Sequence, residues 1–212
     1  MHKEDTNKVA FRDTILNDVK AIIFGGDYAP GDPIREVDIA KRLGVSRVPV
    51  REVFRYLERD GLVEYIPNCG VHVKKLTKTD VKEIYSLRKM LDLFIADEVI
   101  DNITEADIEE LKFLTQRMND KQSYSLCNDL FHNKLFMLSG NSRIRQLWAM
   151  LEGQSRLIMN SCGSSHNMHQ ISVQLHQKIL AALEAADKKA YEEAVRNHAE
   201  IALENILQMM EE

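Results

Sequence analysis

The sequence is poor in the two residues that interrupt regular structure, with four prolines and nine glycines among 212 residues. Long stretches are therefore free to be helical. The chain has no run of about 18 apolar residues, so we expect no membrane-spanning helix. Its polar N-terminal residues also lack the apolar stretch of a secretory signal peptide, and we expect none.

Cysteine is scarce as well, and the cysteines form no CxxC pair. The three positions are Cys69, Cys127 and Cys162. Scattered cysteines in odd number argue against the disulfide framework on which small secreted proteins depend. These absences together favour a cytoplasmic protein that is not associated with a membrane.

Positive charge is in short supply overall, because the formal net charge at pH 7 is −5. The distribution is uneven, since residues 1–76 carry 13 basic and 12 acidic side chains, whereas residues 77–212 carry 15 and 21. Residues 41–59 hold six basic and only two acidic side chains. Exposed charges are screened beyond about 8 Å at physiological salt, so this local basic stretch can still bind phosphates.

Apolar residues at helical spacing predict three helices in the first third of the chain, at residues 9–24, 37–43 and 46–59. The turn-forming residues 27–33 are expected to connect the first two. Gly44 is expected to end the second helix, and the Ser46 side chain to cap the third. Two helices joined by a short glycine-containing turn predict a helix-turn-helix.

The period of the pattern changes after Asp60-Gly61. Residues 62–66 and 71–73 are predicted to be strands joined through residues 67–70, which contain proline, asparagine and glycine. This hairpin is typical of the wing of a winged helix-turn-helix. We therefore expect a DNA-binding domain over residues 1–76.

The remainder of the chain is predicted to be entirely helical and to form an antiparallel bundle. The six predicted helices span residues 79–100, 104–121, 123–139, 142–162, 168–186 and 188–211. Thr104 and Asp107 resemble a capping box in which Asp replaces the usual Glu. The polar stretch 161–170, with His166 and His169, is expected to contain a loop. The fold class is thus mainly α, with a second domain over residues 77–212.

Three arginines recur every four residues along the third predicted helix: Arg47, Arg51 and Arg55. They share one face, opposite an apolar face, so the helix can bury one side and present the other to a DNA major groove. Arginine can form paired hydrogen bonds to guanine or bind phosphates. A solvated charged face is the alternative interpretation of the arginines taken alone.

At this point the chain closely resembles the GntR family of bacterial regulators. The matching residues are Pro30-Gly31, Ile34, Glu36, Ile39-Ala40, Leu43-Gly44-Val45-Ser46-Arg47, Pro49-Val50-Arg51-Glu52, Leu57, Asp60-Gly61-Leu62-Val63, Pro67, Gly70 and Val73. The resemblance implies double-stranded operator DNA as partner, with Arg47 and Arg51 at base edges or phosphates. It also implies that Ser46, Val48 and Pro49 lie at the groove and that Gly70 brings the wing near the minor groove.

Histidine is the informative residue of the second half. His132 lies four residues after Asn128, so the two share a helical face, while His176 and His198 lie on two further predicted helices. The four side chains can converge across a bundle, and neutral imidazoles are common ligands of divalent transition metals. By composition alone, separated histidines are more often ordinary interior or surface residues.

The same half resembles the FCD domain, which follows the winged helix in one GntR subgroup. The residues that carry this resemblance are Leu87-Arg88-Lys89-Met90-Leu91-Asp92, Phe131-His132, Leu135, Gly140-Asn141, His176, Ile179, Ala182, Ala194 and His198. The resemblance implies a metal of the zinc, nickel or manganese type bound by Asn128, His132, His176 and His198. Asn128 departs from the aspartate of metal-binding relatives, which implies a weaker site.

In such relatives the metal orients a small carboxylate effector. Arg88 is the first candidate for its partner and Arg156 the second, because arginine binds carboxylates through two parallel hydrogen bonds. Each arginine is equally explained as a surface ion-pair residue. The resemblance thus implies a small organic acid as ligand.

Three functions are consistent with these observations. The first, which we favour, is a homodimeric, ligand-responsive transcriptional regulator that performs no catalysis. The second is a metal-dependent enzyme in which three histidines form the site and the winged helix localises it on DNA, although the sequence contains no HExxH, nucleophile elbow or P-loop. The third is an interaction protein with inert histidines.

Overall fold

The computed structural model describes residues 3–162 and 166–211, most of which are helical. The chain forms two compact units. The first comprises Met1–Thr77 with Gly153–Ser161, and the second comprises Lys78–Glu152 with Cys162–Glu212. No helix in the described ranges is long and apolar enough to cross a membrane.

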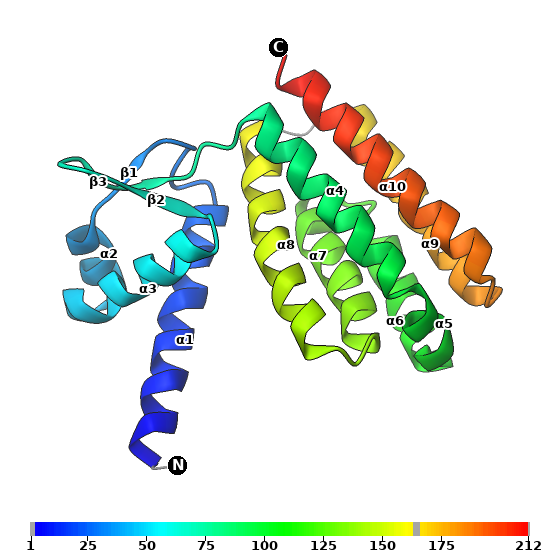
Figure 1. Ribbon diagram of the computed structural model, residues 1–212, viewed down its shortest axis with the longest axis horizontal. Coiled ribbons are helices and arrows are strands. Elements are labelled where there is room, and N and C mark those ends of the chain that lie inside the picture. Colours follow the sequence, from blue (N-terminus) through cyan, green and yellow to red (C-terminus); the bar gives the residue numbers. More distant parts are fainter. Residues whose placement is uncertain (1–2, 163–165, 212) are drawn as a thin grey trace. The chain divides into compact units, whose positions relative to one another are not determined.

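The first unit is a winged helix-turn-helix, as predicted (Figure 1). Its elements are α1 (Lys3–Phe24), β1 (Pro33–Ile34), α2 (Glu36–Leu43), α3 (Arg47–Arg59), β2 (Val63–Ile66) and β3 (Gly70–Val73). The apolar faces of the helices bury Val19, Ile23, Ile39, Val50 and Leu57 almost completely. Each such side chain contributes about 1.5–3 kcal/mol through its burial, so the predicted periodicity is what assembles this core.

The three strands form an antiparallel sheet in the order β1-β3-β2. The two strands of the wing were predicted, whereas β1 lies at the end of the segment predicted to be a connector. Pro33 pairs with His72 and Ile34 with Val71. This short strand forms by pairing with the edge of β3, which is distant in sequence.

The turn between α2 and α3 differs in one detail from the prediction. Gly44 ends α2 in the left-handed conformation, with φ of 67°, as expected. Ser46 occupies the position before α3 with extended backbone, but its side chain makes no capping hydrogen bond. The prediction that the Ser46 side chain caps α3 is therefore wrong, although the helix begins where it was expected to begin.

The second unit is a bundle of helices, in agreement with the predicted class. Its elements are α4 (Lys78–Phe94), α5 (Ala96–Asn102), α6 (Glu105–Arg117), α7 (Lys121–Leu138), part of α8 (Ser142–Cys162), α9 (His166–Glu184) and α10 (Lys188–Met209). α4 and α10 run antiparallel, because ion pairs join Lys78 to Glu211 at 3.2 Å and Lys89 to Glu200 at 3.0 Å. The Thr104–Asp107 capping box is confirmed at the start of α6.

Two predictions for this unit are wrong. The single helix expected at 79–100 is divided at Ile95, so the described residues form seven helices after the wing rather than six. The sequence has no proline or glycine at that break. Ile95, Ala96 and Val99, at and just after it, are buried. In the polar stretch 161–170, where a loop was expected, α9 already begins at His166, so His166 is helical, while residues 163–165 lie outside the described residues. His169, inside the helix predicted to begin at residue 168, is buried with its Nε2 2.6 Å from the Met118 carbonyl oxygen.

Candidate nucleic-acid interface and metal centre

The helix α3 has two contrasting faces. Val50, Val53, Phe54 and Leu57 are at most 3% exposed and anchor the helix in the core. Its other faces carry the predicted DNA-binding residues Ser46, Arg47, Val48, Arg51 and Arg55, all of which are exposed, while Pro49 is half-buried in the first turn. The structure therefore presents the start of α3 and its arginines to solvent together.

A groove of about 760 Å³ lies between α3, the start of α2 and the wing. Arg47, Arg51, Arg55 and Gly70 all line it. Gly70 has φ of 92°, a conformation that residues with a Cβ rarely adopt, and it allows the wing to turn into β3 at this point. Four of the seven predicted DNA-binding residues are thus brought to one surface.

Glu36 also lines this groove, and the sequence assigned it no role. Its carboxylate accepts two hydrogen bonds from Arg51, at 2.8 and 2.9 Å, and one from Arg47, at 3.1 Å. Hydrogen bonding from Arg51 is the main cause that lowers the pKa of Glu36 below its ordinary value, so the carboxylate stays charged. Glu36 lies 11 residues before Arg47 and 15 before Arg51 in the sequence. Because Glu36 belongs to α2 and both arginines belong to α3, helical periodicity could not predict that they form a cluster.

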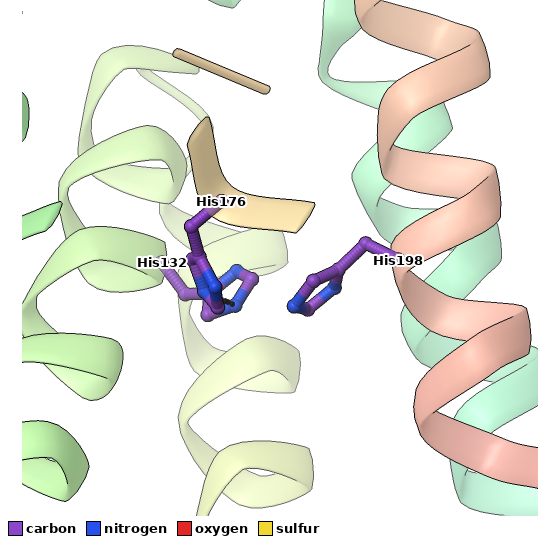
Figure 2. A group of neighbouring side chains, drawn as sticks. All are labelled: His132, His176 and His198. Atoms are coloured by element: carbon purple, nitrogen blue, oxygen red, sulfur yellow. Dashed lines mark hydrogen bonds between the residues drawn. The ribbon is translucent and has the colours of Figure 1, made fainter. Parts of the chain in front are cut away.

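The second site is a cluster of three buried histidines on three helices (Figure 2). His132 comes from α7, His176 from α9 and His198 from α10. Their side-chain nitrogens available as ligands all lie within 4.8 Å of one another. The predicted convergence of these residues is confirmed, and each is less than a tenth exposed.

Hydrogen bonding orients one imidazole toward the centre of the cluster. His176 Nδ1 lies 2.7 Å from the carbonyl oxygen of Ser172, which can only accept, so Nδ1 carries the proton. The lone pair of His176 is therefore on Nε2, which lies 3.2 Å from His132 Nε2. His132 Nδ1 is buried and makes no hydrogen bond within the described residues.

The three imidazoles are held in their neutral form. Burial is the main cause that lowers the pKa of His176 to about 4, and the charge of Arg88 adds to it. Burial likewise places the pKa of His132 and of His198 well below the ordinary value, with the neighbouring histidines and Arg88 acting in the same direction. A neutral imidazole has a free lone pair, which is the form that binds metals.

The donor set fits a borderline divalent metal. Metal–nitrogen distances of about 2.0–2.1 Å place two ligand nitrogens of one ion roughly 3.0–3.4 Å apart, and the observed Nε2–Nε2 separation is 3.2 Å. The carbonyl on His176 Nδ1 is the kind of outer partner that fixes the orientation of a ligating imidazole. Asn128, the fourth predicted ligand, is half-buried one turn before His132, and its amide donates to Asp129 Oδ1 at 3.3 Å.

The two predicted effector-binding arginines lie in different surroundings. Arg88 is buried on α4, its guanidinium 4.9 Å from the ring centre of Trp148, and that indole ring lies 5.6 Å from the ring of His132. Arg156 belongs to the part of α8 grouped with the first unit and has its guanidinium 4.4 Å from the ring of Phe24. The structure therefore brings Arg88 to the histidines, whereas Arg156 packs within the other compact unit.

Two further polar groups of the second unit were not singled out from the sequence. Asp92, one turn after Arg88 on α4, is buried, and this burial raises its pKa to about 7 although the Arg88 charge lowers it. Asp92 Oδ1 and the hydroxyl of Tyr191 are buried without hydrogen bonds in the described part of the chain. The sequence placed Arg88 and Asp92 in the segment that resembles the start of the FCD domain, and it did not reveal that both are buried.

Comparison with known families divides the chain in the same order. Residues 11–73 match the sequence profile of the bacterial regulatory proteins of the gntR family, and residues 83–201 match that of the FCD domain. The uncharacterized HTH-type transcriptional regulator YdhC of Bacillus subtilis (strain 168) is 32% identical, over 92% of this chain and 91% of its own. A probable D-xylose utilization operon transcriptional repressor of Paenarthrobacter nicotinovorans is 28% identical, over 91% and 89%.

Solved structures share the fold over nearly the whole chain. E. coli McbR/YncC superposes with a TM-score of 0.84 at 21% identity, covering 94% of this chain and 98% of its own. A putative transcriptional regulator GntR from Rhodococcus sp. RHA1 gives 0.81 at 25% identity, with the same coverage.

Proposed function

Since this chain belongs to the GntR family of bacterial regulators and carries an FCD domain, we propose that it binds operator DNA in response to a small organic acid. Its family and its relatives are transcriptional regulators rather than enzymes, and this chain is likewise a DNA-binding transcriptional regulator and not an enzyme. The enzymatic alternative raised by the histidines is thereby set aside. Its place of action is the cytoplasm, where operator DNA lies.

The observation that carries the sensing proposal is the convergence of three buried, neutral histidines beside a buried arginine. His132, His176 and His198 would hold a divalent metal of the zinc, nickel or manganese type, with Asn128 as a weaker fourth ligand. Such an ion supplies an open coordination position for a carboxylate oxygen. Arg88 would bind the same carboxylate through paired hydrogen bonds and thereby select an acid over a neutral ligand.

The DNA proposal rests on the exposed face of α3. Arg47, Arg51 and Arg55 would enter the major groove, where arginine pairs with guanine O6 and N7, and the Val48 side chain, 64% exposed, is suited to a thymine methyl group. Ser46 and Pro49 lie at the helix start, where phosphates bind well. Gly70 would bring the wing close to the minor groove.

We expect replacement of Arg51 by alanine to weaken binding to a specific duplex by about 10- to 100-fold, because one paired arginine–guanine contact is worth about 1–3 kcal/mol. The duplex is obtained by selection from a randomised library with the full-length protein, and the affinity is measured by fluorescence anisotropy. Arg196→Ala removes the same charge from an exposed position on α10 and should leave the affinity unchanged. Equal affinities of wild type and Arg51→Ala would refute the assignment.

A dimer would present two copies of α3 to a two-fold operator. Leu87, Met90 and Phe94 on α4 are 44–61% exposed and recur at helical spacing, so they form an apolar stripe that suits a second copy of this chain. We expect a dimeric mass in sedimentation equilibrium and a monomeric mass for Met90→Lys with Phe94→Lys. Leu147→Lys on α8, at another exposed apolar position, should stay dimeric. A monomeric wild type would contradict the proposal.

A further inference from the structure

We propose that Glu36 is a positioning residue for DNA readout, which holds Arg51 with its outer edge directed at a guanine and restrains Arg47 beside it. The inference rests on the proposed role of these two arginines in base recognition. It assigns a function to a carboxylate on the surface proposed to bind DNA. There an acidic group alone would only weaken binding to the negatively charged DNA.

The hydrogen bonds divide the Arg51 guanidinium into two edges. Glu36 Oε1 accepts from Nε at 2.8 Å, and Oε2 accepts from Nη2 at 2.9 Å, so the carboxylate covers the inner edge as a fork. A guanidinium has five N–H groups in one plane, and this fork engages two of them. The remaining three lie on the end formed by Nη1 and Nη2. That end supplies the pair of parallel donors that fits guanine O6 and N7.

Arg47 is held by the same carboxylate but less completely. Its Nη2 donates to Oε2 at 3.1 Å, which leaves four of its N–H groups for DNA. The two arginine side chains are 58% and 52% exposed, whereas that of Glu36 is 21% exposed. The acid is thus the inner member of the cluster, and the cations are the outer members that meet a ligand first.

Two properties of Glu36 suit it to this task. It lies in the first turn of α2, where the helix dipole favours a negative charge. The hydrogen bonds from Arg51 also lower its pKa, so it remains a carboxylate at neutral pH. A long arginine side chain that is already ordered loses less conformational entropy when it binds a base.

The same charge should weaken binding to DNA of the wrong sequence. Where the arginine end finds a guanine, the paired hydrogen bonds compensate for the acid. At other sequences the arginines contact phosphates only, and the negative charge of Glu36 cancels part of that attraction. Glu36 therefore raises the ratio of specific to non-specific affinity rather than affinity as such.

The test compares the affinity of full-length variants for a selected duplex and for a scrambled duplex of equal length, at one salt concentration. We expect Glu36→Gln to bind the scrambled duplex more tightly and to lower the specificity ratio by about tenfold, the loss of roughly one paired contact. Glu36→Asp keeps the charge but is one methylene too short for both arginines, so its ratio should also fall. Asp38→Asn removes an exposed charge from the same turn of α2 and should keep the wild-type ratio.

An unchanged or higher ratio in Glu36→Gln would overturn the inference, as would an equal fall in Asp38→Asn, which would reduce the effect to net charge. A Glu36→Asp variant with the wild-type ratio would overturn the positioning role in the same way. Thermal melting of each variant verifies its fold. If Arg51→Ala itself keeps full affinity for the selected duplex, the base-reading assignment fails; if it loses affinity while Glu36→Gln keeps its ratio, only the role of Glu36 fails.

Discussion

Metal-free protein is expected to become markedly less stable as the pH falls from 7 to 5. The unfolded chain protonates its histidines near pH 6.5, whereas the folded chain keeps the buried ones neutral. A depressed folded pKa therefore contributes stability above pH 6.5 that is lost toward acid. For His176, with a pKa of about 4, the loss between pH 7 and 5 is about 2 kcal/mol, and His132 and His198 add to it in the same direction.

Asp92 acts in the opposite direction and provides an internal control. Its pKa is raised to about 7, so the folded state takes up a proton that the unfolded state does not, and acid stabilises the fold through this group down to about pH 4. Asp92→Asn should therefore steepen the acid loss, and His176→Gln should flatten it. Urea unfolding at pH 7, 6 and 5 with a chelator measures both. Constant stability across this range in Asp92→Asn, where this opposing contribution is absent, would contradict the buried, neutral state of the histidines.

Removal of one histidine of the cluster is expected to weaken divalent-metal binding by about 100- to 1,000-fold. Structural zinc binds with about 10–16 kcal/mol shared among four ligands, so one ligand is worth roughly 2.5–4 kcal/mol. His176→Ala and His198→Ala should each lose the metal during dialysis, as measured by elemental analysis. His72→Ala, on the wing, should retain it. Full occupancy in both cluster variants would rule out the site.

The same preparation tests the effector. Metal at a hundred times its Kd should stabilise the wild type by about 2.7 kcal/mol, which a thermal shift detects. Small carboxylates should raise the melting temperature further only when the metal is present, and Arg88→Ala should lose this second rise while keeping the first. A protein without metal and without any thermal response would instead support inert histidines.

The sequence predicted the elements that depend on local apolar periodicity and on residues that end helices. The apolar faces of α1 and α3 repeat at helical spacing, and Gly44 marks the turn between α2 and α3, so the winged helix-turn-helix was recognisable. The resemblance to known regulators selected His132, His176 and His198 as one cluster. Their separate helices would not have revealed it.

What the sequence did not predict depends on partners distant along the chain. The strand β1 exists because β3 offers a free edge, and Arg51 finds Glu36 only after α2 and α3 have packed. The break at Ile95 and the burial of His169 follow from tertiary packing, and no local sequence pattern predicted either of them. Asp92 was visible as an acid one turn after Arg88, yet its burial, and so its raised pKa, belongs to the folded bundle alone.

The chain has one tryptophan, and its position makes the surroundings of the histidine cluster observable by fluorescence. Trp148 is buried, stacks on Phe136 with ring centres 4.2 Å apart, and lies beside both His132 and Arg88. All indole emission therefore originates next to the histidine cluster, while the DNA-reading unit contributes none. Paramagnetic ions quench such emission and zinc does not, so the fluorescence of the unlabelled protein would report whether the histidine cluster binds a given metal ion.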